Sequence, residues 1–161
     1  MTPGATVRSE CTWRQAGSFE HVAGSQVPFW SDVLLPGEQS RPLRGPTPIE
    51  MLLGALCGCT GVDVVSILEK MKLKPVQMSM NAEAERGEEH PRILRRIWIT
   101  YSIETEPPDA AKVFRAVELS AQKYCAVAAT LAAAGEIRYR VLSAGEEREG
   151  VFAGVGGSAH S

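Results

Sequence analysis

The sequence predicts an α+β fold in which antiparallel strands pack around long central helices. Segments of the 161-residue chain that are rich in β-branched and aromatic residues alternate between apolar and polar positions. A central segment is apolar almost without interruption and opens with helix-capping residues. A second helical region separates the middle strands from a final one. The expected order of elements is therefore βββ-α-ββ-αα-β.

The N-terminal third predicts a small sheet followed by a loop and a long helix. Residues 6–34 carry β-forming residues interrupted by two Gly/Ser turns, which predicts three short antiparallel strands. Residues 36–48 are rich in proline and glycine and predict a loop. Thr47 and Glu50 then supply an N-cap and a capping-box carboxylate around a first-turn proline, so a buried helix should run to about Met71.

The second half predicts a hairpin, two helices and a last strand. Residues 76–85 and 93–105 alternate as strands around an exposed turn. Pro107-Pro108-Asp109 opens a helix that runs to about Lys123, and residues 125–134 form a shorter apolar helix. Residues 137–142 alternate as the final strand.

The chain end predicts a flexible tail. Residues 144–161 are mostly Gly, Ala, Ser and Glu, and bury too little apolar area to offset the entropy lost on ordering. We therefore expect a single domain over residues 1–143, with room for two small lobes.

The composition argues against nucleic acid and membranes as partners. The net charge is −2 from 17 basic and 19 acidic residues, and no basic stripe with interleaved aromatics indicates nucleic-acid binding. The N-terminus lacks the pattern of a signal peptide, which favours a cytoplasmic protein. The most apolar run, residues 51–62, is shorter than the roughly 18 residues that suggest a membrane span, so we expect a core helix and no membrane association.

Four cysteines are too few and too unevenly spaced for a secreted disulfide scaffold. In a reducing compartment Cys11, Cys57, Cys59 and Cys125 are inert, ligands or catalytic. Cys57 and Cys59 would point about 200° apart on a helix and cannot share one tetrahedral ion, and the three histidines are scattered. We therefore expect no metal and no cofactor.

Two of these cysteines stand out by position, although a cysteine on an apolar helix is usually a small buried hydrophobe. Cys125 lies where one helix ends and another begins, and a helix N-terminus stabilises a thiolate. Asp63 lies four residues after Cys59 and so on the same helix face. It either pairs with a basic group or repels a thiolate at Cys59.

Two segments resemble the OsmC/Ohr superfamily of osmotically inducible and organic hydroperoxide resistance proteins. They are residues 48–68, around Gly58-Cys59-Thr60-Gly61, and residues 115–127, around Tyr124-Cys125-Ala126. The resemblance covers roughly residues 7–142 and belongs to an OsmC-like branch. It implies an interlocked homodimer with active sites at the subunit interface. It also implies a stress-response peroxidase with Cys59 as the peroxidatic and Cys125 as the resolving cysteine.

Two further site candidates come from the same resemblance. Glu50 corresponds to a helix-start glutamate, but it lies nine residues before Cys59, about 13 Å along the axis and on the opposite face. Direct contact within one straight helix is excluded, and the capping box explains Glu50 equally well. Arg14 is the nearest match to a hairpin arginine of Ohr proteins, with the other early arginines, Arg8, Arg41 and Arg44, as alternatives.

The expected reaction is reduction of an organic hydroperoxide through a Cys59 sulfenic acid and a Cys59–Cys125 disulfide. A cellular dithiol would restore the thiols; lipoylated proteins serve some Ohr-type relatives. Leu56, Val62 and Tyr124 would favour alkyl substrates. The alternative is a non-catalytic dimer, binding a small ligand or associated with stress, that retains the fold without turnover.

Overall fold

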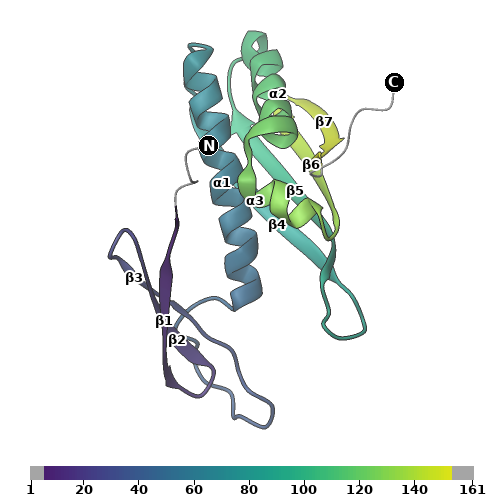
Figure 1. Ribbon diagram of the computed structural model, residues 1–161. Helices are drawn as coiled ribbons and strands as arrows, with labels where there is room; N and C mark the ends of the chain where they lie inside the picture. The colour runs from purple at the N-terminus through teal and green to yellow at the C-terminus, as the bar shows by residue number, and fades with distance from the viewer. Residues whose placement is uncertain (1–5, 154–161) are drawn as a thin grey trace. The chain divides into compact units, whose positions relative to one another are not determined.

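The structure, a computed structural model, describes residues 6–153, which divide into two compact units between Leu52 and Leu53. The N-terminal unit holds a three-stranded antiparallel sheet in the order β1-β2-β3 (Figure 1). Its strands are β1 (Ser9–Gln15), β2 (Ser18–Ala23) and β3 (Pro28–Ser31). The three strands expected over residues 6–34 are therefore present.

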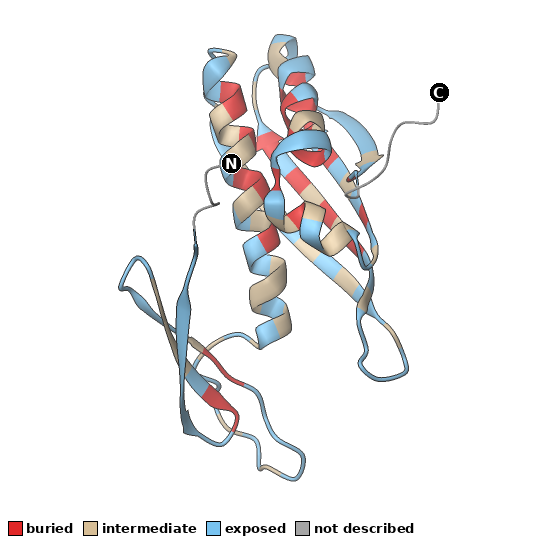
Figure 2. Ribbon diagram, in the orientation of Figure 1, coloured by how far each residue is buried: buried red, intermediate tan, exposed pale blue. Residues whose placement is uncertain are grey.

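The N-terminal unit has few buried side chains: in Figure 2, β1 is pale blue throughout, and β2 and β3 are mostly pale blue or tan. The unit is stabilised by a buried, hydrogen-bonded carboxylate. The fully buried carboxylate of Asp32 accepts bonds from Arg41 Nη1 and Nη2 at 2.6 and 2.9 Å and from the Arg44 backbone N–H at 3.0 Å. These bonds, with that of Arg41 first, hold the pKa of Asp32 well below its usual range. A buried, fully bonded carboxylate thus ties the proline-rich loop to the end of β3.

The C-terminal unit is a four-stranded sheet in the order β4-β5-β6-β7, with helices against one face (Figure 1). Its strands are β4 (Gln77–Arg86), β5 (Leu94–Glu104), β6 (Glu136–Ser143) and β7 (Glu146–Val151). Its helices are a 3₁₀ turn (Pro107–Asp109), α2 (Ala110–Leu119), a π-helical turn (Ser120–Tyr124) and α3 (Ala126–Ala132).

Helix α1 (Pro48–Lys70) begins in the N-terminal unit and continues into the C-terminal one. The expected capping box forms at its start: the Glu50 carboxylate accepts from the Thr47 N–H and hydroxyl, and the Glu50 N–H donates to Thr47 Oγ1.

By length and composition α1 could cross a membrane, since an 18-residue window has a mean hydropathy of 1.9. The apolar segment is longer than residues 51–62 alone suggested, because α1 is again apolar after Asp63.

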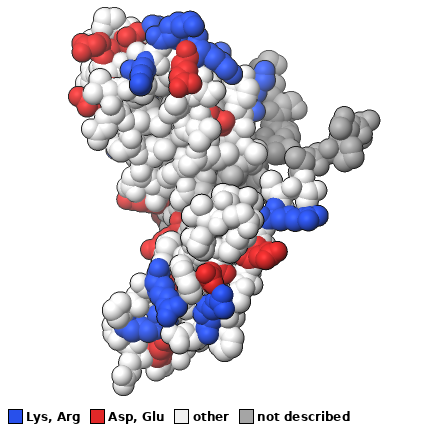
Figure 3. Space-filling model, turned by 90° about the vertical axis from the view of Figure 1, so that its left-hand side faces the viewer, with Lys and Arg blue, Asp and Glu red and all other residues white. Residues whose placement is uncertain are grey.

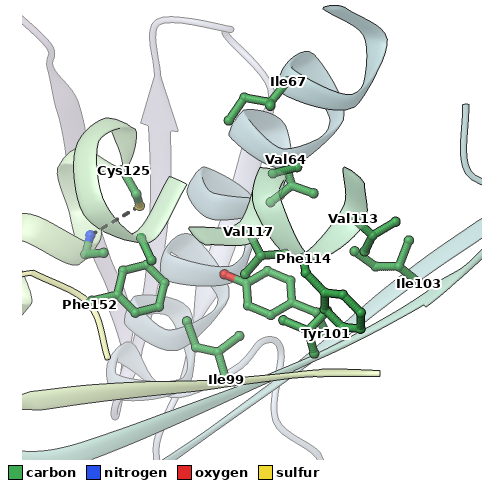
Figure 4. Packing of buried hydrophobic residues seen from close by; sticks show 14 of the residues in the cluster. Val64, Ile67, Ile99, Tyr101, Ile103, Val113, Phe114, Val117, Cys125 and Phe152 are labelled. Atoms are coloured by element: carbon green, nitrogen blue, oxygen red, sulfur yellow. Dashed lines mark hydrogen bonds between the residues drawn. The ribbon is translucent and has the colours of Figure 1, made fainter. Parts of the chain in front are cut away.

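The core of the C-terminal unit forms between the sheet and the helices. Leu56, Val64 and Leu68 bury one stripe of α1 at helical spacing. Every second residue of β5 faces the same core, and Tyr101 lies there among Val113, Phe114 and Val117 of α2 (Figure 4). This packing identifies α1 from Leu56 to Leu68 as a core helix.

Two expectations about the sheet were wrong. The β5–β6 pair is parallel, because the helices between these strands form a crossover that returns the chain in the same direction. Residues 146–151, expected to belong to a tail, form the edge strand β7. A turn with positive φ at Ala144 and Gly145 joins it to β6, and the side chain of Phe152 is buried behind it. The rest of the expected tail, residues 154–161, lies outside the described residues.

Candidate active site

The fold brings together three side chains that can carry chemistry. The Sγ atoms of Cys59 and Cys125 and a carboxylate oxygen of Asp63 all lie within 4.8 Å of one another. Cys59 and Asp63 come from consecutive turns of α1, and Cys125 lies at the start of α3. All three belong to the C-terminal unit, so one compact unit builds the cluster.

A π-helical turn places Cys125. After α2 the chain widens over Ser120–Tyr124, and the Cys125 N–H donates to the Ser120 carbonyl at 3.2 Å. Single π-helical turns of this kind are frequent at functional sites. Cys125 then leaves helical geometry, with φ −74° and ψ 104°, and becomes the N-cap of α3. Its Sγ accepts a bond of 3.3 Å from the Ala128 N–H, drawn dashed in Figure 4.

Asp63 is bonded to the same π-helical turn. The Ser120 hydroxyl donates to an Asp63 carboxylate oxygen at 3.2 Å. Asp63 therefore has a hydroxyl group as its hydrogen-bond partner, and not the basic group that was one of the two alternatives expected from the sequence. One bond thus connects α1 to the turn that positions Cys125.

The environment of Cys125 favours its thiol form. Burial raises the pKa of Cys125 to about 12, and the neighbouring Cys59 and Asp63 act in the same direction. The Ala128 N–H lowers this pKa but does not prevail. Cys125 stands at a helix N-terminus as expected, yet the stabilisation of a thiolate expected there is outweighed by desolvation.

The other two cysteines lie outside the cluster. Cys57 is half-buried, and burial raises the pKa of its thiol. Its carbonyl accepts from the Thr60 hydroxyl at 3.2 Å. Cys11 is exposed on β1. Cys57 therefore offers a comparison for Cys59 on the same helix.

A cavity of about 320 Å³ opens beside the cluster. Asp63, Ser66 and Tyr124 line it together with apolar and basic neighbours, Ile67, Lys70, Met71 and Leu119. Of the three side chains expected to select alkyl substrates, Tyr124 lines this cavity. Leu56 is instead fully buried in the core, and Val62 is 72% exposed on α1.

The remaining predicted residues lie in the N-terminal unit, and all of them except Arg8 have a local partner among the described residues. Arg14 pairs with Glu20 across the β1–β2 hairpin, with its Nε donating at 2.9 Å. Glu50 closes the capping box with Thr47. Of the alternative arginines, Arg41 binds Asp32 and the Arg44 guanidinium lies 4.9 Å from the centre of the Trp30 ring.

Ser120 and Ala128 contact the cluster but were not predicted from the sequence. The signal available for Ala128 was its place three residues after an N-cap, where a backbone N–H points at the capping side chain. Ser120 carried no comparable signal, because its role depends on the π-helical turn and on the packing of α1 against it.

Comparisons with known proteins agree with this architecture. Residues 37–140 match a family model described as OsmC-like protein. Protein YhfA of Escherichia coli K12 is 41% identical over 103 residues, which are 63% of this chain and 77% of YhfA.

Two solved structures show the same fold. The OsmC-like protein from Mycoplasma pneumoniae superposes with a TM-score of 0.73 at 17% identity, over 86% of this chain and 97% of that one. The organic hydroperoxide resistance protein OhrB of Bacillus subtilis gives 0.58 at 12% identity, over 86% and 98%. The expected α+β class is confirmed.

Proposed function

This chain belongs to the OsmC-like protein family, and from that premise we propose that it is a thiol-dependent peroxidase that reduces organic hydroperoxides. The resemblance to OsmC/Ohr proteins is thereby confirmed, and structural relatives include proteins named for organic hydroperoxide resistance. The observation that carries the proposal is the approach of two sulfurs from distant segments: Cys59 and Cys125 lie within 4.8 Å.

The proposed cycle uses both sulfurs. The Cys59 thiolate attacks the distal oxygen of the hydroperoxide, an S–O bond forms, the O–O bond breaks and the alcohol leaves with a proton. The Cys125 sulfur then attacks the Cys59 sulfenic acid, forming a disulfide and releasing water. A dithiol reductant, for which a lipoylated protein is a candidate, returns both residues to thiols.

Burial supports this division of roles. Cys59 is half-buried, whereas Cys125 is only 4% exposed and its pKa is raised to about 12. A thiol that keeps its proton reacts slowly with peroxide, because the thiolate is the nucleophile. Cys125 is therefore suited to react second, with a sulfenic acid on Cys59, and not to attack the substrate first. Its Sγ lies within 4.8 Å of Cys59 Sγ.

The cavity beside Asp63 supports an organic substrate. Ile67, Leu119 and the Tyr124 ring give it apolar walls close to the cluster. An alkyl or aryl group of the hydroperoxide would rest against these side chains while its peroxide oxygen reaches Cys59. Arg14 stays a candidate for the cation that stabilises the leaving alkoxide, and Glu50 stays a candidate for the carboxylate that orients such a cation.

We further propose that the protein works as an interlocked homodimer in the cytoplasm. The small N-terminal unit exposes several large apolar side chains, among them Trp13, Phe19, Val27, Phe29 and Val33. Along α1, a groove of about 480 Å³ is lined mainly by small and apolar residues, Gly58, Gly61, Val62, Val65, Ser66, Glu69, Met78 and Met80. Seen from the side on which α1 lies, the upper part of Figure 3 is a broad, mostly uncharged surface between charged side chains at its top and acidic ones at its lower edge. Exposed apolar surfaces of this kind favour burial against a second copy of the chain.

The proposal is tested by peroxide consumption with a dithiol reductant. Cys59→Ser should reduce the rate to that of reductant alone, and Cys125→Ser should let Cys59 proceed to sulfinic acid, visible by mass spectrometry. Cys57→Ser, two residues away on the same helix, is the matched control and should retain the wild-type rate. Turnover that survives Cys59→Ser would contradict the proposed role of Cys59.

The bonds of Arg14 to Glu20 and of Glu50 to Thr47 favour a second reading, in which the protein retains the fold and cysteines without useful turnover. It would then be a dimer that binds a small ligand or accompanies a stress response. Slow oxidation that is equal in Cys59→Ser and Cys125→Ser would support this reading, because it would remove the paired roles of the two thiols.

A further inference from the structure

The cluster of Cys59, Asp63 and Cys125 has the composition of a metal site. Two thiols and a carboxylate supply one ligand atom each, and the three atoms lie within 4.8 Å of one another. Zn²⁺ binds thiolate sulfur at about 2.3 Å and carboxylate oxygen at about 2.0–2.2 Å. Tetrahedral angles then place two sulfur ligands about 3.8 Å apart and a sulfur and an oxygen ligand about 3.6 Å apart, so no pair of ligand atoms needs to close by more than about 1.2 Å.

The ligands are held on ordered elements. Cys59 and Asp63 are four residues apart on α1 and therefore project from one helix face. The Ala128 N–H bonds to Cys125 Sγ at 3.3 Å, and the Ser120 hydroxyl bonds to the Asp63 carboxylate at 3.2 Å. Hydrogen bonds of this kind to the ligands orient them in protein metal sites and raise metal affinity.

The sequence expectation of no metal considered ligands close together in the chain. Cys57 and Cys59 cannot share an ion, and that argument still holds. The fold supplies a different set, because the π-helical turn brings Cys125 to the face of α1 that carries Cys59 and Asp63. The cavity of about 320 Å³ that Asp63 lines opens one of the three ligands to solvent.

We propose that Cys59, Asp63 and Cys125 form a binding site for a thiol-seeking divalent cation, represented by Zn²⁺, with the fourth position open to water. Thiolate ligands select Zn²⁺ over Mg²⁺ and Ca²⁺, which take oxygen ligands. Cysteine binds a metal ion as a thiolate, so protons compete with the cation and the affinity rises with pH.

This site does not depend on the peroxidase proposal, although it bears on it. A cation that holds both sulfurs makes neither of them available to a peroxide. If the peroxidase proposal holds, Zn²⁺ should therefore protect Cys59 from oxidation. The binding itself is measured without peroxide, so failure of the peroxidase leaves the test of the metal site intact.

The test uses the full reduced chain under anaerobic conditions. Zn²⁺ affinity is measured by competition with a chromogenic chelator, and Cd²⁺ reports sulfur ligation through its ultraviolet charge-transfer band. We expect one ion per chain. Cys59→Ser, Cys125→Ser and Asp63→Asn should each lower the affinity by at least about tenfold, since even groups that only hydrogen-bond a ligand contribute about 10–100-fold.

Cys57→Ser is the matched control and should bind Zn²⁺ like the wild type. X-ray absorption of the zinc-loaded wild type is the second readout, independent of whether a variant folds, and should show two sulfur neighbours. Wild-type protein that binds no ion, a site with fewer than two sulfurs, or binding abolished by Cys57→Ser but retained by Cys59→Ser would overturn the proposal.

Discussion

At Cys125, burial and a helix N-terminus act in opposite directions on one thiol. The side chain is 4% exposed, and the loss of hydration outweighs the bond from the Ala128 N–H. The result is a sulfur that sits within reach of Cys59 but keeps its proton. A two-cysteine cycle needs this asymmetry, because the first attack must fall on the other sulfur.

The protonation of Cys125 predicts its labelling by a thiol reagent. Its pKa is raised from 9.0 to about 12, so alkylation of Cys125 in the reduced native protein should still increase with pH above pH 10. Peptide mass spectrometry after short pulses of iodoacetamide resolves each cysteine, with the exposed Cys11 as an internal comparison. Labelling of Cys125 as fast as Cys11 at neutral pH would contradict the raised pKa.

The same shift predicts a stability change with the opposite dependence on pH. Because the folded chain holds the Cys125 proton more tightly than the unfolded chain, its contribution to stability is complete below the unfolded pKa. It is lost as the pH rises from about 9 towards 12. Urea denaturation of the wild type and of Cys125→Ala between pH 8 and pH 11 checks this, since the variant should lose less stability over that interval.

At the scale of elements, α1 depends on its capping box as well as on its buried stripe. Thr47→Ala removes the acceptor of the Glu50 N–H and should lower the free energy of unfolding by about 1 kcal/mol. Glu50→Gln should lower it less, because glutamine also serves at this position of the box. Urea denaturation of the two variants measures both effects.

The same pair of variants tests the role of Glu50. If the capping box is its whole contribution, peroxide consumption should change no more in Glu50→Gln than in Thr47→Ala. A rate that falls in Glu50→Gln alone would assign Glu50 to the active site as well.

Most elements could be predicted from the sequence because their signals are local. The capping residues Thr47 and Glu50 and the alternation of β4 and β5 reflect backbone chemistry within a few residues. β7 could not be predicted from composition, since its charged residues belong to an edge strand held by β6. Its turn begins with Ala144 where Asn, Asp or Gly is usual.

The candidate site also has features that could be predicted from the sequence and others that could not. Cys59 and Cys125 were found through a family resemblance, and the structure places them together. The i, i+4 relation of Cys59 and Asp63 follows from helix geometry alone. The bond from Ser120 to Asp63 requires a π-helical turn and long-range packing, neither of which a single sequence encodes in a readable pattern.

At the scale of the whole molecule, the two units differ in how they bury apolar side chains. The C-terminal unit has a contiguous core, whereas large side chains of the N-terminal unit such as Trp13 are exposed, at 63%. A small sheet with so little core of its own is marginal in water. The proposed homodimer would remove this exposure together with that of the groove along α1.

The dimer predicts the effect of one charge on α1. Val62 is 72% exposed and lines the apolar groove, so Val62→Glu should shift the protein from dimer to monomer in sedimentation velocity experiments. Val76→Glu is the matched control: Val76 is 77% exposed but lies outside that groove, and the variant should sediment like the wild type. A wild type that sediments as a monomer at all concentrations would contradict the homodimer.

The central claim is that Cys59 and Cys125 form a peroxide-reactive pair. It is tested most directly by mixing the reduced protein with one equivalent of an organic hydroperoxide and mapping the products by intact-mass and peptide mass spectrometry. We expect rapid loss of two hydrogens in a Cys59–Cys125 disulfide, with Cys57 and Cys11 remaining thiols. Survival of both Cys59 and Cys125 as thiols, or a disulfide that involves Cys57 instead, would contradict it.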